Sequence, residues 1–213
     1  MDTDEPKNVI RELSSAQRRI LGVLMEKAFT TPDQYPLTLK SLASGCNQKS
    51  NRDPVTSYSE DAVLGAVDEL RDMMLVAEVF TDGGRAARYR HYMRYRFDFS
   101  EQEFAIIAEL LLRGGQQPGE LRTRASRMVR IDSKEVLQSC LASLQEKGFI
   151  RSSGPLERRG VLVDHTFYSA SQTPELATES EPESATAIPP AVVPAAAAHD
   201  SEIRELRDQV TRQ

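Results

Sequence analysis

The feature that most constrains the fold of this 213-residue chain is an internal repeat of its apolar residues. Two shifts of the sequence bring the repeated positions together, and both preserve the spacing of an amphipathic helix or a half-buried strand. At a shift of 86 the coinciding pairs are Leu13/Phe99, Ile20/Ile106, Leu21/Ile107, Leu24/Leu110 and Met25/Leu111. At a shift of 74 they are Val63/Leu137, Val67/Leu141, Leu70/Leu144, Leu75/Phe149, Val76/Ile150 and His91/His165. The pattern therefore predicts two related folding units.

The two shifts differ because the first unit contains an additional polar stretch, around Gln48 to Tyr58. We place the first unit at residues 13–97 and the second unit at residues 98–170, after an N-terminal extension at residues 1–12. Each unit is large enough to bury a small hydrophobic core.

Each unit is expected to contain three helices followed by a strand hairpin. The helices of the first unit begin after Ser14 or Ser15, Thr38 and Ser59, and its strands cover residues 76–80 and 88–95. The helices of the second unit begin after Ser100, at Pro118 and after Asp132-Ser133, and its strands cover residues 149–152 and 161–168. Three helices closed by a two-stranded wing are the winged form of the helix-turn-helix. We therefore predict a mainly α fold of the α+β class, with two tandem winged-helix domains.

The end of the chain differs from the rest in composition and charge. Residues 171–200 are rich in Pro, Ala, Thr, Ser and Glu and predict a disordered linker. Residues 201–213 predict either a short amphipathic helix that pairs two chains into a homodimer or a frayed tail. Eight acidic and three basic residues follow residue 170, whereas residues 1–170 contain 24 of each, so the whole net charge of −5 belongs to this acidic end. Electrostatic arguments about the two units must rest on local placement.

The sequence lacks the features of several classes of protein. No stretch approaches the about 20 apolar residues of a membrane span, and the acidic N-terminus is unlike a secretion signal, which favours a cytoplasmic protein without membrane contact. Cys46 and Cys140 are interpreted as small core residues, and the scattered Cys and His residues predict no metal and no cofactor. The sequence lacks a phosphate-binding glycine loop, a nucleophile elbow and a metalloprotease His-Glu motif. We therefore expect a protein that is not an enzyme.

The third helix normally enters the DNA major groove in a winged helix, and its charge differs between the two units. In the first unit this helix is acidic, which disfavours contact with phosphate and suits a basic or amphipathic protein partner. In the second unit it is near neutral, which makes it the better candidate for reading DNA. The acidic residues that form the candidate partner-binding surface are Glu60, Asp61, Asp68, Glu69 and Asp72.

Arginine residues gather at two other places. The first is the predicted wing of the first unit, where Arg85, Arg88 and Arg90 are interleaved with aromatic residues. Strand alternation places Arg88, Arg90, Tyr92, Arg94 and Arg96 on one face and Tyr89, His91, Met93 and Tyr95 on the other. The second place is helix two of the second unit and the turn after it, with Arg122, Arg124, Arg127 and Arg130. These arginines predict contact with the nucleic-acid backbone, and the alternative is a solvated face that pairs with neighbouring acids.

The polar insertion contains two further candidate phosphate contacts, Lys49 and Arg52. Their side chains suit a phosphate or a partner carboxylate. In the alternative interpretation, Asn47, Asn51 and Asp53 hydrogen-bond the loop backbone and hold an irregular loop before Pro54.

Two stretches of sequence carry a resemblance to a known family. They are Tyr35-Pro36-Leu37 with Gly45-Cys46-Asn47-Gln48-Lys49-Ser50-Asn51-Arg52-Asp53-Pro54-Val55, and Leu111-Leu112-Arg113-Gly114-Gly115-Gln116-Gln117-Pro118-Gly119-Glu120-Leu121-Arg122. Over about residues 13–168 the chain resembles the bacterial YceH family. The resemblance implies a tandem winged-helix fold and a C-terminal coiled-coil-like segment, and it supplies no catalytic or binding residues.

These observations lead to one functional expectation and one alternative. The expectation is a transcription-regulator-like protein that grips double-stranded DNA through arginine-rich wing and helix-two surfaces. The alternative is a protein-interaction module that uses the acidic third helix of the first unit and binds no DNA.

Overall fold

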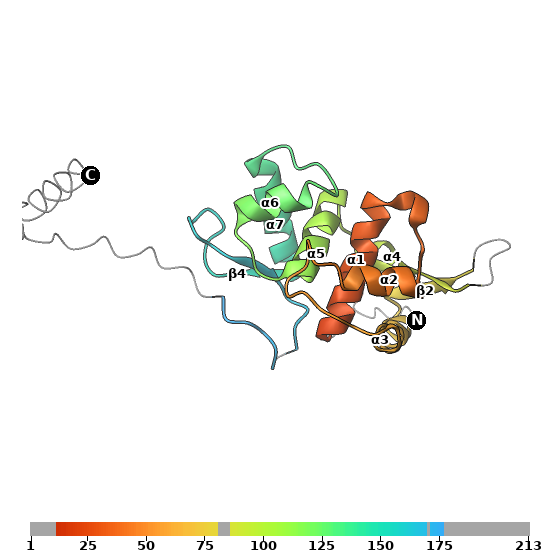
Figure 1. Cartoon of the computed structure of the whole chain (residues 1–213). Helices are drawn as coiled ribbons and strands as arrows, with labels where there is room; N and C mark the ends of the chain where they lie inside the picture. The colour runs from red at the N-terminus through yellow and green to blue at the C-terminus, as the bar shows by residue number, and fades with distance from the viewer. Residues whose placement is uncertain (1–11, 81–85, 170, 177–213) are drawn as a thin grey trace, which may run out of the picture. The chain divides into compact units, whose positions relative to one another are not determined.

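The computed structural model describes residues 12–80, 86–169 and 171–176 (Figure 1). These residues form a mostly helical α+β structure with seven α-helices, one 3-10 turn and five short strands in antiparallel sheets. The N-terminal extension up to residue 11, the tip of the first hairpin, the predicted linker from residue 177 on and the amphipathic segment at residues 201–213 lie outside the described residues.

The helices of the first unit begin at the expected caps. Ser14 and Gln17 form a capping box at the start of α1 (Ser15–Thr30), which the 3-10 turn η1 (Pro32–Gln34) follows. The Thr38 side chain caps α2 (Leu39–Cys46), and the Ser59 side chain caps α3 (Glu60–Asp72). Each cap satisfies a backbone N–H of the first helical turn. The three predicted starts are therefore confirmed.

The strands of the first unit form a three-stranded sheet, one strand more than predicted. β2 (Val76–Val79) pairs with β3 (Arg88–His91), and Val76 lies opposite His91. The additional strand β1 (Leu37–Thr38) pairs with the other edge of β3. Two residues give too short a pattern for a strand to be predicted from sequence.

The second predicted strand of the first unit is shorter than expected. The prediction extended it to residue 95, but β3 ends at His91 and residues 93–96 form the short helix α4 (Met93–Arg96). The interior explains the difference, because Met93 and Phe97 are buried whereas Tyr95 between them is exposed, which fits the period of a helix and not the alternation of a strand. Tyr95, which strand alternation placed on the packed face, is 68% exposed.

The second unit follows the same order of elements. A capping box of Ser100 and Glu103 starts α5 (Glu101–Arg113), which ends at Gly114 with a φ of 74°. Helix α6 (Pro118–Ala125) and α7 (Lys134–Glu146) precede β4 (Ile150–Ser152) and β5 (Val163–His165). Ile150 lies opposite His165 in this pair of strands. The predicted helix starts are confirmed, and both strands are shorter than expected.

The core joins the two units, because α1 and α5 lie side by side (Figure 1). Gly22 makes this approach close: a Cβ there would lie 3.0 Å from Cγ of Leu112. Phe97 stacks on Phe99 and Phe149 packs edge-to-face against both, with ring centroids 4.8 to 5.3 Å apart. One continuous apolar cluster therefore runs through both units. Cys46 is buried and Cys140 half-buried, both without a disulfide.

Candidate nucleic-acid interface

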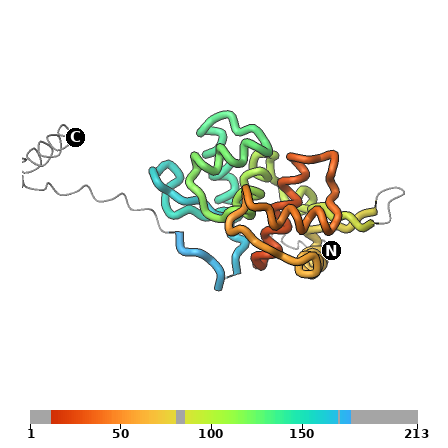
Figure 2. Tube along the Cα trace, in the orientation of Figure 1, coloured from red at the N-terminus to blue at the C-terminus, as the bar shows by residue number. Residues whose placement is uncertain are grey.

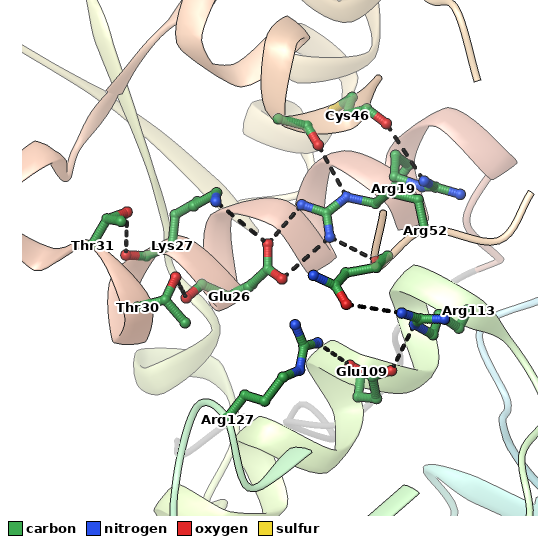
Figure 3. Close-up of polar contacts among 12 residues, drawn as sticks. Arg19, Glu26, Lys27, Thr30, Thr31, Cys46, Arg52, Glu109, Arg113 and Arg127 are labelled. Atoms are coloured by element: carbon green, nitrogen blue, oxygen red, sulfur yellow. Dashed lines mark hydrogen bonds and ion pairs between the residues drawn. The ribbon is translucent and has the colours of Figure 1, made fainter. Parts of the chain in front are cut away.

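Arg52, a candidate phosphate contact, lies in the interior. Its side chain is 0% exposed and forms a two-pronged ion pair with Glu26, at 2.6 and 3.2 Å (Figure 3). Its guanidinium group also donates to the carbonyl oxygens of Gly45 at 3.0 Å and Asn51 at 2.8 Å. All its polar atoms face protein groups, so Arg52 does not contribute to a phosphate-binding surface. Lys49 is exposed.

Of the three residues in the alternative interpretation, Asn47 hydrogen-bonds the loop backbone as proposed, whereas the Asn51 side chain bonds Arg113 and Asp53 bonds through its backbone N–H. The Asn47 side chain donates to the carbonyl of Tyr58 and accepts from its N–H, both at 2.8 Å. The Asp53 N–H donates to the carbonyl of Leu112 at 3.0 Å. Asn51, with a φ of 59°, accepts a hydrogen bond from Arg113 at 2.9 Å. Figure 2 shows this loop, in orange, reaching from α2 toward α5 before it returns to α3. Its residues therefore connect the two units.

A second buried carboxylate, Glu109 of α5, engages another candidate arginine. Glu109 is 0% exposed and lies 3.0 Å from both Arg113 and Arg127 (Figure 3). Burial raises the pKa of Glu109, and the two guanidinium groups oppose that shift. Arg127 is thus held at the end of α6 by an internal partner, which its sequence neighbours did not reveal.

The remaining arginines of the α6 region are also engaged. Arg124 pairs with Glu120 and donates to the side chain of Gln116 at 2.8 Å. Arg122 is half-buried and donates weakly to the carbonyl of Asp132 at 3.5 Å, next to the start of α7. Arg130 pairs with Asp132 but is 89% exposed on its side chain. Exposed pairs of this kind contribute little to stability, so their arginines can exchange partners at low cost.

The arginines of the first wing are partly packed. Arg88 donates to the carbonyl of Pro36 at 2.9 Å, which ties β3 to the segment before β1. Arg90 is half-buried, and its Nε has no hydrogen-bond partner among the described residues. The alternation of Arg88 and Arg90 with buried Tyr89 and His91 holds within β3. Arg85 lies outside the described residues.

The two histidines that coincide in the repeat are buried, and each is the last residue of the second strand of its hairpin. Burial lowers the pKa of His91 to about 4 and that of His165 to about 3. Both imidazoles are therefore neutral at pH 7. Among the described residues, no group of three or more His, Cys, Asp or Glu side chains is arranged to hold a metal ion.

Helix α3 presents the acidic surface that the sequence indicated. Its five candidate partner-binding residues, Glu60, Asp61, Asp68, Glu69 and Asp72, are exposed. Two of them have partners within the protein, since Asp68 accepts from Arg71 at 2.8 Å and Glu69 accepts from Gln17 at 2.6 Å. The exposed apolar residues Met74 and Phe80 follow on the same stretch of chain.

The second unit has two exposed arginines that the sequence interpretation did not single out. Arg158 and Arg159 lie in the turn between β4 and β5, and neither forms an ion pair with another described residue. The exposed side of α7 is less acidic than that of α3, with the uncharged residues Val136, Ser139, Ala142 and Gln145 beside the charged residues Lys134, Glu135 and Glu146. The sequence does contain a signal for these two arginines, since they are adjacent in a turn that Gly154 and Gly160 flank.

These features define a helix-rich α+β protein of two similar segments joined by a shared apolar core and by hydrogen bonds from the insertion. The sequence matches the family described as "Protein of unknown function, DUF480" over residues 13–159, and the chain belongs to that family. It is 39% identical to the UPF0502 protein RB6530 of Rhodopirellula baltica, over 97% of this chain and 87% of that protein. UPF0502 proteins of Azoarcus sp. and Geobacter sulfurreducens are 46% and 50% identical over 64% and 63% of this chain. These two matches span 60% and 61% of the relatives' own lengths, which is less than two thirds. The resemblance to the YceH family is therefore confirmed as membership of this bacterial family.

The described residues contain no helix that is both long and apolar enough to cross a membrane.

Proposed function

We propose that this protein is a non-enzymatic, cytoplasmic tandem winged-helix protein that binds the backbone of double-stranded DNA through its second unit. Two equivalences between the units support the fold assignment. Val76 pairs with His91 as Ile150 pairs with His165, and residues before α2 and α6 both pair with the last strand of their unit. A winged helix brings its third helix and its wing to the same duplex.

The observation that carries the DNA proposal is the free pair of arginines in the β4–β5 turn. Arg158 and Arg159 are exposed and have no ion pair among the described residues, whereas Arg52 and Arg127 are held by internal carboxylates. Helix α7 begins with exposed Lys134, next to Arg122. The second unit therefore combines two exposed arginines in the β4–β5 turn with a third helix that is less acidic than α3 and so repels phosphate less.

The proposal is tested by binding of a random duplex to the full chain at several salt concentrations. Affinity should fall steeply with salt, by a slope of about −0.9 per phosphate contacted. Replacing Arg158 and Arg159 by Ala should weaken binding and reduce that slope by about two units, because two phosphate contacts are removed. The matched control is Arg71→Ala, which removes an arginine paired with Asp68 and Glu78 on the acidic surface and should leave binding unchanged.

No binding at low salt would refute the proposal and favour the second candidate function. That candidate is docking of a basic, amphipathic protein segment on α3. It is favoured by the five exposed carboxylates of α3 together with Met74 and Phe80, which are 59% and 65% exposed. Under this alternative, charge reversal by Asp61→Lys and Asp72→Lys abolishes capture of a partner from a lysate, and the double Ala variant in the β4–β5 turn does not.

A further inference from the structure

A pocket of about 400 Å³ lies where the two units meet. Its wall comes from α1, the insertion, the end of α5, β5 and residues 174–176, segments that are far apart in the sequence. A volume of this size accommodates a small organic molecule. The pocket lining includes neither Arg158 nor Arg159, and it includes no residue of α7.

Two arginines of α1 line this pocket and are unusually buried. Arg18 is 9% exposed and Arg19 is 4% exposed. Arg18 donates to the carbonyl of Leu13 and, at 3.3 Å, to the side-chain oxygen of Gln172. Arg19 donates to the carbonyls of Cys46 at 3.4 Å and Pro54 at 2.7 Å, and its contact with Cys46 is visible in Figure 3. All these acceptors are neutral oxygen atoms.

Within the described part of the chain, neither Arg18 nor Arg19 forms an ion pair with a carboxylate. A buried guanidinium group without a counter-charge is costly, and proteins normally pair such a group. Burial lowers the pKa of both arginines, which is the electrostatic sign of the same cost. The comparison with Arg52 is direct, because that buried arginine has Glu26 as its partner.

The other charged groups of the lining do not supply the missing counter-charge. Arg113 is paired with Glu109, and the buried Asp164 is paired with Arg151 at 3.4 Å. Asp53 and Glu175 are exposed to solvent, and within the described residues neither forms an ion pair with Arg18 or Arg19. Arg18 and Arg19 therefore line the pocket without a described carboxylate in direct contact, and only the longer-range attraction of Asp164 and Asp53 acts on them.

We propose that this pocket binds a small organic anion, whose carboxylate or phosphate group lies against Arg18 and Arg19. The rest of the ligand is aromatic or apolar, because Tyr58, Leu111 and Leu162 also line the pocket. The Arg18 guanidinium group lies 4.4 Å from the centroid of the Tyr168 ring, which holds it in place for a planar anionic group. A ligand seated here touches both units at once. This inference is independent of the DNA proposal.

The experiment titrates the full chain with phenyl phosphate and with benzoate at constant ionic strength, and uses phenol and inorganic phosphate as comparison probes. Calorimetry and thermal unfolding report binding. At least one of the two aromatic anions should bind more tightly than phenol and more tightly than inorganic phosphate. It should raise Tm by roughly 5 to 10 °C at about a hundred times its Kd. The better of the two aromatic anions identifies the preferred anionic group.

Two variants locate the binding. Arg18→Gln should raise Kd roughly ten- to a hundredfold, because a charge-assisted hydrogen bond is lost. Gly115→Tyr places a ring in the pocket without altering either arginine, since a Cβ at Gly115 already lies 3.2 Å from Leu176. The Gly115→Tyr variant should not bind the anion, and its circular dichroism spectrum should match that of wild type. This variant therefore tests the site even if the Arg18 variant does not fold.

The matched control is Arg130→Gln, which removes an exposed arginine outside the pocket and should leave Kd unchanged. The proposal is overturned if neither aromatic anion binds, if phenol or inorganic phosphate binds as tightly as both, or if the Gly115 variant retains binding. An equal loss of affinity in the Arg130 variant would also overturn it, because that result describes attraction to the surface as a whole.

Discussion

The ion pair between Arg52 and Glu26 gives the most quantitative prediction. Both side chains are buried, at 0% and 5% exposure, and Arg52 forms four hydrogen bonds to protein oxygens. Replacing Arg52 by Met removes all four hydrogen bonds and leaves the buried Glu26 carboxylate with only the more distant Lys27, at 3.9 Å, as a counter-charge among the described residues. Breaking a buried pair from one side costs about 3 to 5 kcal/mol. For a chain of this size, that corresponds to a fall in Tm of roughly 6 to 20 °C.

The measurement is the free energy of unfolding of wild type and of Arg52→Met, from equilibrium unfolding in urea at pH 7. The two m-values should be equal, so that a lower midpoint reports a loss of stability. Arg158→Met is the matched control, because it removes an exposed arginine without an ion pair among the described residues and should change stability by less than about 0.5 kcal/mol. The double variant with Glu26→Met and Arg52→Met should be more stable than Arg52→Met alone, since it leaves no buried carboxylate. The reasoning fails if Arg52→Met lies within about 1 kcal/mol of wild type, which is the range of an exposed ion pair.

Three further predictions concern the packing, the pH dependence and a helix cap. Gly22→Val should lower the free energy of unfolding in urea by about 1 to 3 kcal/mol, because even a Cβ at this position would lie 3.0 Å from Leu112. An unchanged urea midpoint would show that α1 and α5 separate easily. Burial lowers the pKa of His91 to about 4, so the unfolded state binds the extra proton between about pH 6.5 and 4 and stability falls as the pH is lowered through that range. The fall should be smaller in His91→Gln, and equal pH profiles of the two proteins would contradict this. Ser100→Ala removes the capping box with Glu103 and should cost about 1 kcal/mol by the same urea assay, whereas a neutral result would mean that packing alone sets the start of α5.

Much of the fold follows from local patterns that the sequence states directly. The helix starts at Ser14, Thr38, Ser59 and Ser100 were predicted because a side-chain oxygen can satisfy free backbone N–H groups within its own helical turn. The end of β3 was not predicted, because alternation places Met93 and Tyr95 on one packed face, whereas in the structure Met93 is buried and Tyr95 is exposed. The alternation of neighbouring residues does not show which side chains the rest of the core will bury.

The candidate interface was less accessible to sequence reasoning. Arg52 and Arg158 are both arginines in polar stretches, yet one is fully buried and the other exposed. Arg127 was grouped with its neighbours by sequence, although its partner Glu109 lies 18 residues away. Whether an arginine meets solvent depends on which carboxylate the fold brings to it, and sequence spacing contains no such distance.

The sequence by itself determined the repeat, the order of helices and strands, and the confinement of the net charge to the end of the chain, since each is a property of neighbouring residues or of composition. Tertiary structure decided which charged groups are neutralised, and it left Arg18 and Arg19 buried beside a pocket without a carboxylate of their own among the described residues. The physical reason is that hydrogen bonding and periodicity act over a few residues, whereas desolvation and ion pairing act between side chains that meet only after α1, α5 and the insertion have packed together.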